Sequence, residues 1–297
     1  MKAIGAAWLL AAALATAGAR AQVLSDELLV WLKVQGPVRA APEADYGPFV
    51  YAEADGRIEG LSIDMLRLVQ QHTGLQVVWL PPRPLSEQVA AARERRADLL
   101  TSLRPTPERS EYLAFTQPYV SVPAVLVLGP TAKVGSGPDP LRELAGRPVA
   151  VGKGYAVESV MKTRHPQVRW LPVPDDVEAL RRVAAGQADG AVADAASVAF
   201  VMARHRLDGL HIAGRVGFDY TLSFAVRKDW PELREVIDRG IRAIKPEERR
   251  RVMGRWAPML EAADHVPRAR WATAVAGTLL GLALAAGLLA WRRRSRR

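Results

Sequence analysis

The chain has 297 residues, of which 49% are hydrophobic and 24% charged, a composition typical of a folded protein with one large or two medium domains. Its formal net charge of +10 includes Lys2, Arg20 and five arginines in residues 292–297, so the rest of the chain carries only about +3 and we expect no nucleic-acid partner. The absence of cysteine excludes disulfides and thiolate metal sites.

The first 21 residues have the pattern of a secretion signal. Met1 and Lys2 form a short basic start, residues 4–17 are almost wholly apolar, and Ala19-Arg20-Ala21 offers small residues at the spacing that a signal peptidase needs. We predict that residues 1–21 are a signal peptide and that the mature chain starts near Gln22.

Alternating strands and helices are predicted after a Pro/Gly/Asp-rich loop at residues 42–49. We expect a strand near residue 50, a helix from residue 61 that ends at Gly74, a strand at 76–80, a helix at 85–95 and a strand at 99–100. The last strand leads into a polar, proline-broken loop that carries Arg104 and Arg109. This order favours an open, parallel sheet with helices on both faces.

The same order repeats in the second half of the chain. We expect a strand at 148–151, a helix to about 164, a strand at 168–173, a helix at 176–185 and a strand that ends at 194. Each half therefore places a polar residue after a strand, Ser102 in one and Asp194 in the other. Ligands of open α/β sheets bind outside the carboxyl ends of the strands, so the repeat predicts a two-lobe clamp with one cleft.

Two extended segments are expected to connect the lobes, residues 121–128 and the region before residues 220–226. The predicted boundaries are 22–120 and 222–262 for the first lobe and 124–218 for the second. Helices expected at 231–244 and 246–256 begin with proline followed by glutamate, as helix N-termini prefer, and we expect them to pack on the first lobe.

Residues 271–291 are predicted to cross a membrane. They contain no charged residue, and 21 residues at about 1.5 Å each span a hydrocarbon layer of about 30 Å. Trp271 and Trp291 stand at the two ends, and the basic tail at 292–297 marks the cytoplasmic side. The prediction is a single-pass protein whose body lies outside the cytoplasm.

Several motifs occur in an order that resembles a known family. They are Tyr46-Gly47-Pro48-Phe49, residues 56–64 (GRIEGLSID), Thr106-Pro107-Glu108-Arg109, Phe115-Thr116-Gln117-Pro118-Tyr119, and Ala188-Asp189 followed by Asp194. Over residues 30–259 the chain resembles the bacterial extracellular solute-binding proteins of family 3, periplasmic amino-acid binders and their sensor relatives. The resemblance implies an α/β, two-lobe periplasmic-binding-protein (Venus flytrap) fold with two hinge crossings.

Three segments resemble a narrower group, the Venus-flytrap sensor domains of virulence-sensor-type hybrid histidine kinases. They are residues 154–157 (GYAV), residues 222–233 (LSFAVRKDWPEL) and residues 245–249 (KPEER) before Trp256. Those sensors continue past the membrane into a kinase, whereas this sequence has six residues after the predicted span. We therefore expect the output to pass to a separate partner.

The resemblance assigns two opposed roles in the cleft. Arg109 takes the position that clamps the α-carboxylate of an amino acid, and Asp194 takes the position that receives the α-amino group. A guanidinium offers a planar fork of donors that matches a carboxylate. From the residues alone, Arg109 also fits a surface arginine paired with Glu108 or Glu111, and Asp194 fits a helix N-cap.

Seven further residues complete the expected ligand site: Tyr46, Thr101, Ser102, Arg104, Tyr119, Gly154 and Tyr155. Arg104 departs from the family, whose amino-acid binders place a small hydroxyl residue there, and residues 154–156 lack the usual threonine. A second cation favours a ligand with two acidic groups or an aromatic acid. Alternatively, Arg104 fills the cleft of a closed form without ligand.

The predicted function is a membrane-anchored periplasmic binding protein of the bacterial inner membrane that closes on a small organic acid or amino acid and signals to a partner. The partner is a histidine kinase or, if the protein serves uptake, an ABC permease. A dehydratase-like enzyme on the same fold is a remote alternative, with Glu43 as a lone acid. We expect no cofactor, no catalytic residue and no metal, since the five histidines lack metal spacing.

Overall fold

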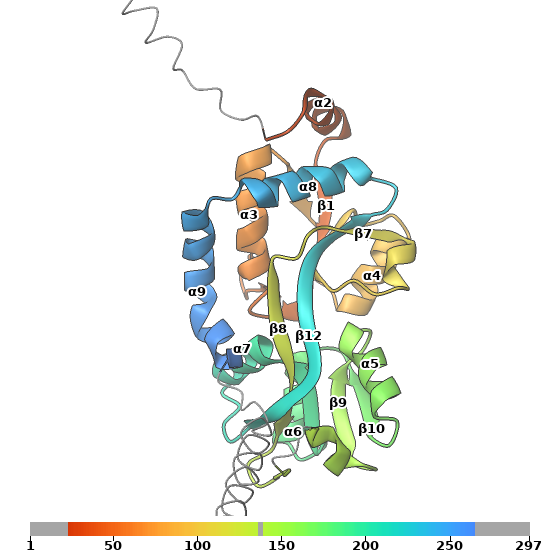
Figure 1. Ribbon diagram of the computed structural model, residues 1–297, viewed down its shortest axis with the longest axis vertical. Coiled ribbons are helices and arrows are strands. Elements are labelled where there is room, and N and C mark those ends of the chain that lie inside the picture. The colour runs from red at the N-terminus through yellow and green to blue at the C-terminus, as the bar shows by residue number, and fades with distance from the viewer. Residues whose placement is uncertain (1–22, 136–138, 265–297) are drawn as a thin grey trace, which may run out of the picture.

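The computed structural model describes residues 23–135 and 139–264 of the chain (Figure 1). The predicted signal peptide, membrane span and basic tail lie outside these described residues. Within the described ranges, no helix is long and apolar enough to cross a membrane.

The first lobe is built on a sheet whose central strands are parallel. The parallel strands are β5 (Val77–Trp79), β1 (Val38–Ala41) and β6 (Leu99–Leu103), joined by antiparallel β7 (Leu113–Phe115) and the end of β12 (His211–Arg227). Its helices are α2 (Asp26–Gln35), α3 (Leu61–Thr73), α4 (Leu85–Arg93) and α8 (Pro231–Ala243), and α2, which the sequence analysis did not predict, lies at the end away from the second lobe (Figure 1).

A small antiparallel sheet forms where the sequence predicts mainly a loop. Its strands are β2 (Asp45–Tyr46), β3 (Val50–Ala52) and β4 (Ile58–Glu59). This sheet leaves Phe49 and Val50 fully buried and Tyr46 only 3% exposed, so the loop is a packed part of the first lobe. It positions Glu43 and Tyr46 beside the second lobe.

The second lobe repeats the parallel arrangement. Its strands are β10 (Arg169–Val173), β9 (Pro148–Gly152) and β11 (Gly190–Asp194) in parallel, followed by antiparallel β8 (Val120–Leu128). The helices are α5 (Ala156–Arg164), α6 (Asp176–Ala184) and α7 (Ala195–His205). Because β9, β10 and β11 run in the same direction, the helices that follow them start at one edge of the sheet, which faces the first lobe (Figure 1).

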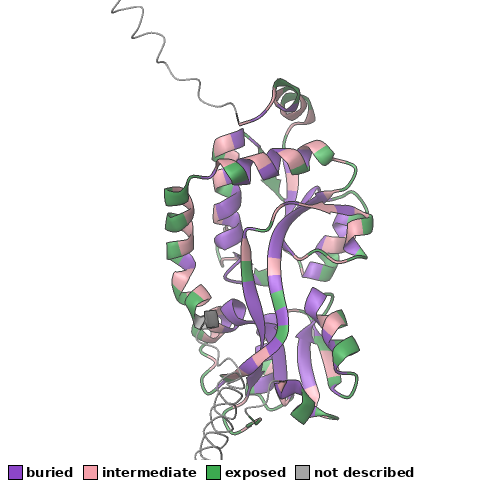
Figure 2. Ribbon diagram, viewed as in Figure 1, coloured by how far each residue is buried: buried purple, intermediate pink, exposed green. Residues whose placement is uncertain are grey.

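Two long strands, β8 and β12, join the lobes side by side (Figure 1). The first part of β12 pairs with β8 up to Leu222, and its last residues, from Ser223 to Arg227, pair with β6 and β7 of the first lobe. Both strands are mostly buried along their length (Figure 2). Since the two segments expected to cross between the lobes lie on these strands, the structure has the predicted pair of extended connections.

The last described helix, α9 (Pro246–Asp264), extends beyond the predicted end at Trp256. We expected it to pack on the first lobe, and it contacts α3 there, with the Trp256 indole donating to Asp64 at 3.0 Å. It also packs against α7 of the second lobe (Figure 1). The expectation was therefore incomplete, because the length of α9 carries it past the first lobe.

Candidate functional site

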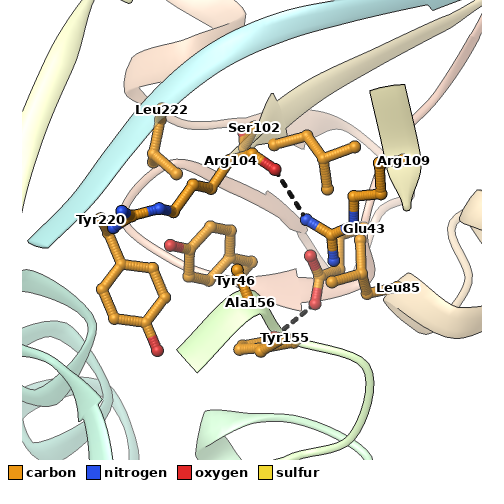
Figure 3. Close-up of a pocket in the computed structure, with 11 residues that line it drawn as sticks. Glu43, Tyr46, Leu85, Ser102, Arg104, Arg109, Tyr155, Ala156, Tyr220 and Leu222 are labelled. Carbon is orange, nitrogen blue, oxygen red and sulfur yellow. Dashed lines mark hydrogen bonds between the residues drawn. The ribbon is translucent and has the colours of Figure 1, made fainter. Parts of the chain in front are cut away.

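A small cavity lies where the two lobes meet on β12. Its lining comes from the first lobe (Glu43, Tyr46, Leu85, Ser102, Leu103, Arg104, Arg109), the second lobe (Tyr155, Ala156) and β12 (Tyr220, Leu222), as Figure 3 shows. The cavity volume is about 20 Å³, which is room for about one water molecule. The lobes are therefore closed on each other, and a ligand the size of an amino acid requires them to separate.

Arg109 crosses from the first lobe to the second. It begins the short 3₁₀ helix at Arg109–Glu111, and its Nη1 donates to the Arg104 carbonyl oxygen at 2.9 Å. Its Nη2 donates to the Gly154 carbonyl oxygen of the second lobe at 2.6 Å. The residue is only 6% exposed, and burial lowers the pKa of the guanidinium. Both partners are neutral carbonyls, so the positive charge is hydrogen-bonded without being matched by an ion pair in the described residues.

Glu43 forms the second contact across the cleft. The Tyr155 hydroxyl of the second lobe donates to Glu43 Oε1, as the dashed line in Figure 3 shows. Burial raises the pKa of Glu43 to about 8, although the Tyr155 hydrogen bond and the charge of Arg109 oppose that shift. The carboxyl group therefore carries a proton at neutral pH and forms a neutral bridge between the lobes.

Arg104 points along the cavity toward β12 (Figure 3). Its guanidinium carbon lies 4.0 Å from the centre of the Phe218 ring, which is cation–π geometry. Burial lowers its pKa, and its buried Nη1 atom has no hydrogen-bond partner among the described residues. Arg104 thus occupies cleft volume next to Tyr220, while one of its donors stays available.

A chain of hydroxyl groups supports the wall of the first lobe. Ser102 Oγ donates to Ser62 Oγ at 2.8 Å, and Ser62 Oγ lies 2.6 Å from the Tyr119 hydroxyl. Tyr119 in turn donates to the Thr101 carbonyl oxygen at 2.7 Å, and its ring packs on Phe224. Of these residues only Ser102 lines the cavity, so Thr101 and Tyr119 hold it in place from behind.

Asp194 ends β11 and is completely buried. Its Oδ1 accepts from the Ser197 backbone amide at 2.8 Å, so it caps α7, as its N-cap interpretation requires. Its Oδ2 has no hydrogen-bond partner in the described part of the chain. Burial raises the pKa of this carboxyl, against the hydrogen bonds from Ser197. The cap thus uses one oxygen and leaves the other available.

Five of the nine expected site residues line the cavity: Tyr46, Ser102, Arg104, Arg109 and Tyr155. Gly154 contributes its carbonyl to Arg109, whereas Thr101, Tyr119 and Asp194 lie behind the lining. The sequence analysis did not include Leu85, Leu103, Ala156, Tyr220 and Leu222 in the site, and it considered Glu43 only as a lone acid. The sequence could have indicated Tyr220 and Leu222, because they lie on a predicted connection between the lobes and such a connection passes the cleft.

Further contacts close the lobes at the rim. Arg204 of α7 pairs with Glu53 of the first lobe at 2.9 Å and lies over the Tyr51 ring. Phe200, also on α7, packs against Tyr51 with ring centres 4.8 Å apart. A Cβ added to Gly47 would lie 2.1 Å from the Phe200 ring, so this approach requires glycine.

The two lobes carry polar groups of opposite charge at or near the cleft. Arg109 offers an unmatched cation on one lobe, and Asp194 offers a free carboxylate oxygen on the other. Within the described residues, no group of three or more His, Asp or Glu side chains is placed to hold a metal ion.

Comparison with known proteins identifies the family of the chain. The family model described as bacterial extracellular solute-binding proteins, family 3, matches residues 38–259. The virulence sensor protein BvgS of Bordetella pertussis is 27% identical over 261 residues, which is 87% of this chain and 20% of that sensor. The L-arginine-binding protein of Pseudomonas aeruginosa is 27% identical over 170 residues, 54% of this chain and 62% of that protein.

Solved structures have the same fold. The crystal structure of the Bordetella pertussis BvgS periplasmic VFT2 domain matches with a TM-score of 0.70 and 26% identity, covering 78% of this chain and 98% of that domain. An ancestral arginine-binding protein bound to arginine matches with a TM-score of 0.67 at 23% identity, over 74% of this chain and 98% of that structure. These sequence relatives are sensor and binding proteins. The chain therefore belongs to the bacterial extracellular solute-binding proteins of family 3.

Proposed function

We propose that this chain is a membrane-anchored periplasmic sensor component that closes its two lobes on a small amino acid or organic acid and reports the closure to a partner. The observation that carries the proposal is Arg109, which is 6% exposed, lies at the lobe interface and donates to two neutral carbonyl oxygens. A buried cation without a counter-ion is costly, and a ligand carboxylate supplies that counter-ion in bidentate geometry.

The proposed ligand lies between the lobes with its carboxylate on Arg109 and, for an amino acid, its α-ammonium group on Asp194. Arg109 then exchanges the Gly154 carbonyl for the ligand, and Asp194 uses the oxygen that α7 does not need. A ligand held from both sides favours the closed form by the difference between its affinities for the closed and open forms. The strands β8 and β12 absorb the hinge motion.

The ligand proposal is tested by a thermal-shift screen of the chain against amino acids, dicarboxylates and aromatic acids. We expect at least one compound with a carboxylate to raise the melting temperature. Replacing Arg109 with alanine should abolish that rise, whereas Arg83→Ala, an exposed arginine of the same lobe, should preserve it. A stabilising ligand whose effect survives Arg109→Ala would contradict the site.

We further propose that residues 1–21 direct export and that residues 271–291 anchor the domain in the inner membrane with the C-terminus in the cytoplasm. The support is the sequence pattern of the two ends. Alkaline phosphatase, which is active only outside the cytoplasm, should be active when fused after residue 266 and inactive when fused after residue 297. Equal activity of both fusions would contradict the span.

The proposed output is signalling, supported by the similarity to the virulence sensor BvgS over 87% of this chain. A second candidate is delivery of an amino acid to an ABC permease, favoured by the similarity to the L-arginine-binding protein of Pseudomonas aeruginosa. The genes beside this one separate the two: permease and ATPase genes would contradict sensing, and a kinase or response-regulator gene would contradict uptake.

A further inference from the structure

Asp176 is a buried acid whose position the fold does not explain. It is the first residue of α6, is 1% exposed, and neither of its carboxylate oxygens has a hydrogen-bond partner among residues 23–135 and 139–264. It is not needed as a helix cap, because Asp175 accepts from the Glu178 amide at 2.8 Å and fills that role. Buried polar groups without partners are rare in folded proteins. The stability of the closed, ligand-free fold therefore does not explain why an acid is buried at position 176.

Other polar atoms around Asp176 are left without partners in the same way. Asp194 Oδ2 and the hydroxyls of Tyr46 and Tyr220 are buried and have no hydrogen-bond partner in the described ranges. Burial raises the pKa of Asp176 well above its usual range, and the charges of Asp194, Glu43 and Asp175 raise it further. Three oxygens of the two carboxyl groups therefore lack a donor, although the tyrosine hydroxyls can donate and the charge of Arg104 acts on Tyr220.

This cluster lies directly behind the ligand cavity. Tyr46, Tyr155 and Tyr220 line the cavity, and the charge of Asp176 contributes to the raised pKa of each of them. Tyr46 belongs to β2 of the first lobe, whereas Asp176 and Asp194 belong to the second. Separation of the lobes would therefore move Tyr46 away from the two carboxyl groups whose charges act on it.

We infer that Asp176 is a second carboxylate of the ligand site and binds the positively charged side chain of a basic amino acid. This inference rests on the proposed function, in which Arg109 takes the α-carboxylate and Asp194 the α-ammonium group. A cation supplies donors to the oxygens that lack them and a charge opposite to both acids. Arg104 then serves the packing on Phe218 in place of a second ligand carboxylate.

Two matched ligand pairs isolate the side-chain charge: lysine with norleucine, and arginine with citrulline. Calorimetry on the full chain in detergent should show that the charged member binds more tightly. Asp176→Asn should weaken binding of the charged member by about tenfold or more and that of the neutral member by less than about twofold. The control is Glu178→Gln, which removes an acid of the same helix whose side chain pairs with Arg182 on the outer surface.

The outcomes separate this inference from the proposed function. If neutral amino acids bind and a charged side chain adds nothing, the Asp176 subsite is wrong and the proposed function stands. If Asp176→Asn weakens both members equally, or if Glu43→Gln instead removes the preference for charge, the assignment to Asp176 is wrong. If no amino acid or organic acid binds at all, the proposed function itself is contradicted.

Two further measurements distinguish binding from a structural role. Asp176→Asn should keep or raise the melting temperature without ligand, because it removes a buried acid that lacks partners; a clear decrease would indicate a structural residue. Lysine should also release more protons than norleucine on binding to the wild type, as seen from the buffer dependence of the binding enthalpy. That difference should disappear in Asp176→Asn, and its persistence would contradict the inference.

Discussion

The two walls of the cleft differ in how completely their polar groups are satisfied. On the first lobe, Ser102, Ser62 and Tyr119 form a continuous chain of hydrogen bonds, and Arg109 donates to two carbonyls. On the second lobe, both oxygens of Asp176 and one of Asp194 have no partner among the described residues. The hydroxyl chain of the first wall is thus fully hydrogen-bonded, although Arg104 Nη1 and the Tyr46 hydroxyl on the same wall lack partners in the described residues, as do the carboxylate oxygens of the second wall.

This difference matters for the closed state without ligand. Burying acids without partners opposes closure, so other contacts have to hold the lobes together. Those contacts are the Tyr155–Glu43 hydrogen bond, the Arg109–Gly154 hydrogen bond, and the aromatic and ionic contacts of α7 at the rim. Substitutions at Glu43 and at the rim probe two of these contacts, beginning with the largest expected effect.

The largest effect should come from the protonation of Glu43. Its pKa of about 8 in the closed protein exceeds the ordinary glutamate value of 4.5, so the closed form binds the proton more tightly. Its contribution to stability is fully present below about pH 4.5, decreases as the pH rises toward 8, and amounts to at most roughly 5 kcal/mol. Melting temperatures at pH 5, 7 and 9 should fall less steeply for Glu43→Gln than for the wild type. Parallel curves would show that Glu43 is ionised in the closed state.

A substitution that adds volume between the lobes should have the next largest effect. Gly47→Ala places a Cβ at 2.1 Å from the Phe200 ring, so either the ring moves away from Tyr51 or the lobes separate. We expect the substitution to destabilise the closed form relative to the open form by about 1–3 kcal/mol. The shift should appear as a larger radius of gyration in small-angle scattering. Phe200→Ala in the same chain makes room and should restore the compact form. If the double variant were as open as Gly47→Ala alone, the clash with the Phe200 ring would not be the cause of the opening.

Two tyrosine hydroxyls of the first lobe compare a hydrogen-bonded group with an unpartnered one. Tyr119→Phe removes hydrogen bonds to Ser62 and to the Thr101 carbonyl and should destabilise the protein by about 1–2 kcal/mol. Tyr46→Phe removes a buried hydroxyl that has no partner in the described residues and should be neutral or slightly stabilising. Urea unfolding of both variants measures the difference. Equal losses would mean that the Tyr46 hydroxyl is as well hydrogen-bonded as that of Tyr119.

The sequence was sufficient to predict the two lobes and their parallel strands. These features depend on local signals: apolar runs that end at a polar residue, prolines at helix starts, and motifs with fixed spacing. Two lobes with parallel strands and the extended connections are confirmed by the structure and the family match. The assignment of ligand contacts stays a prediction.

The burial of Glu43 and Asp176 could not be predicted from the sequence, because it depends on contacts between distant segments. Glu43 lies in a stretch that has the composition of a loop, and only its approach to Tyr155, 112 positions away, makes it part of the cleft. Asp176 has the sequence context of an ordinary acid at a helix start, where it is expected to face solvent. Packing decides which of the two adjacent acids, Asp175 or Asp176, caps the helix and which is buried.

The smallest effect is expected at the rim, where Arg204 pairs with Glu53. The two side chains are 36% and 26% exposed, so water and salt screen the pair, and Arg204→Ala should cost no more than about 1 kcal/mol of closure. Scattering at low and high salt should show a small, salt-dependent shift toward the open form. The matched control is Arg182→Ala, which breaks a pair with Glu178 inside the second lobe and should leave the lobe angle unchanged. If Arg204→Ala opened the protein as far as Gly47→Ala, closure would depend on the rim rather than on the contacts at the centre of the cleft.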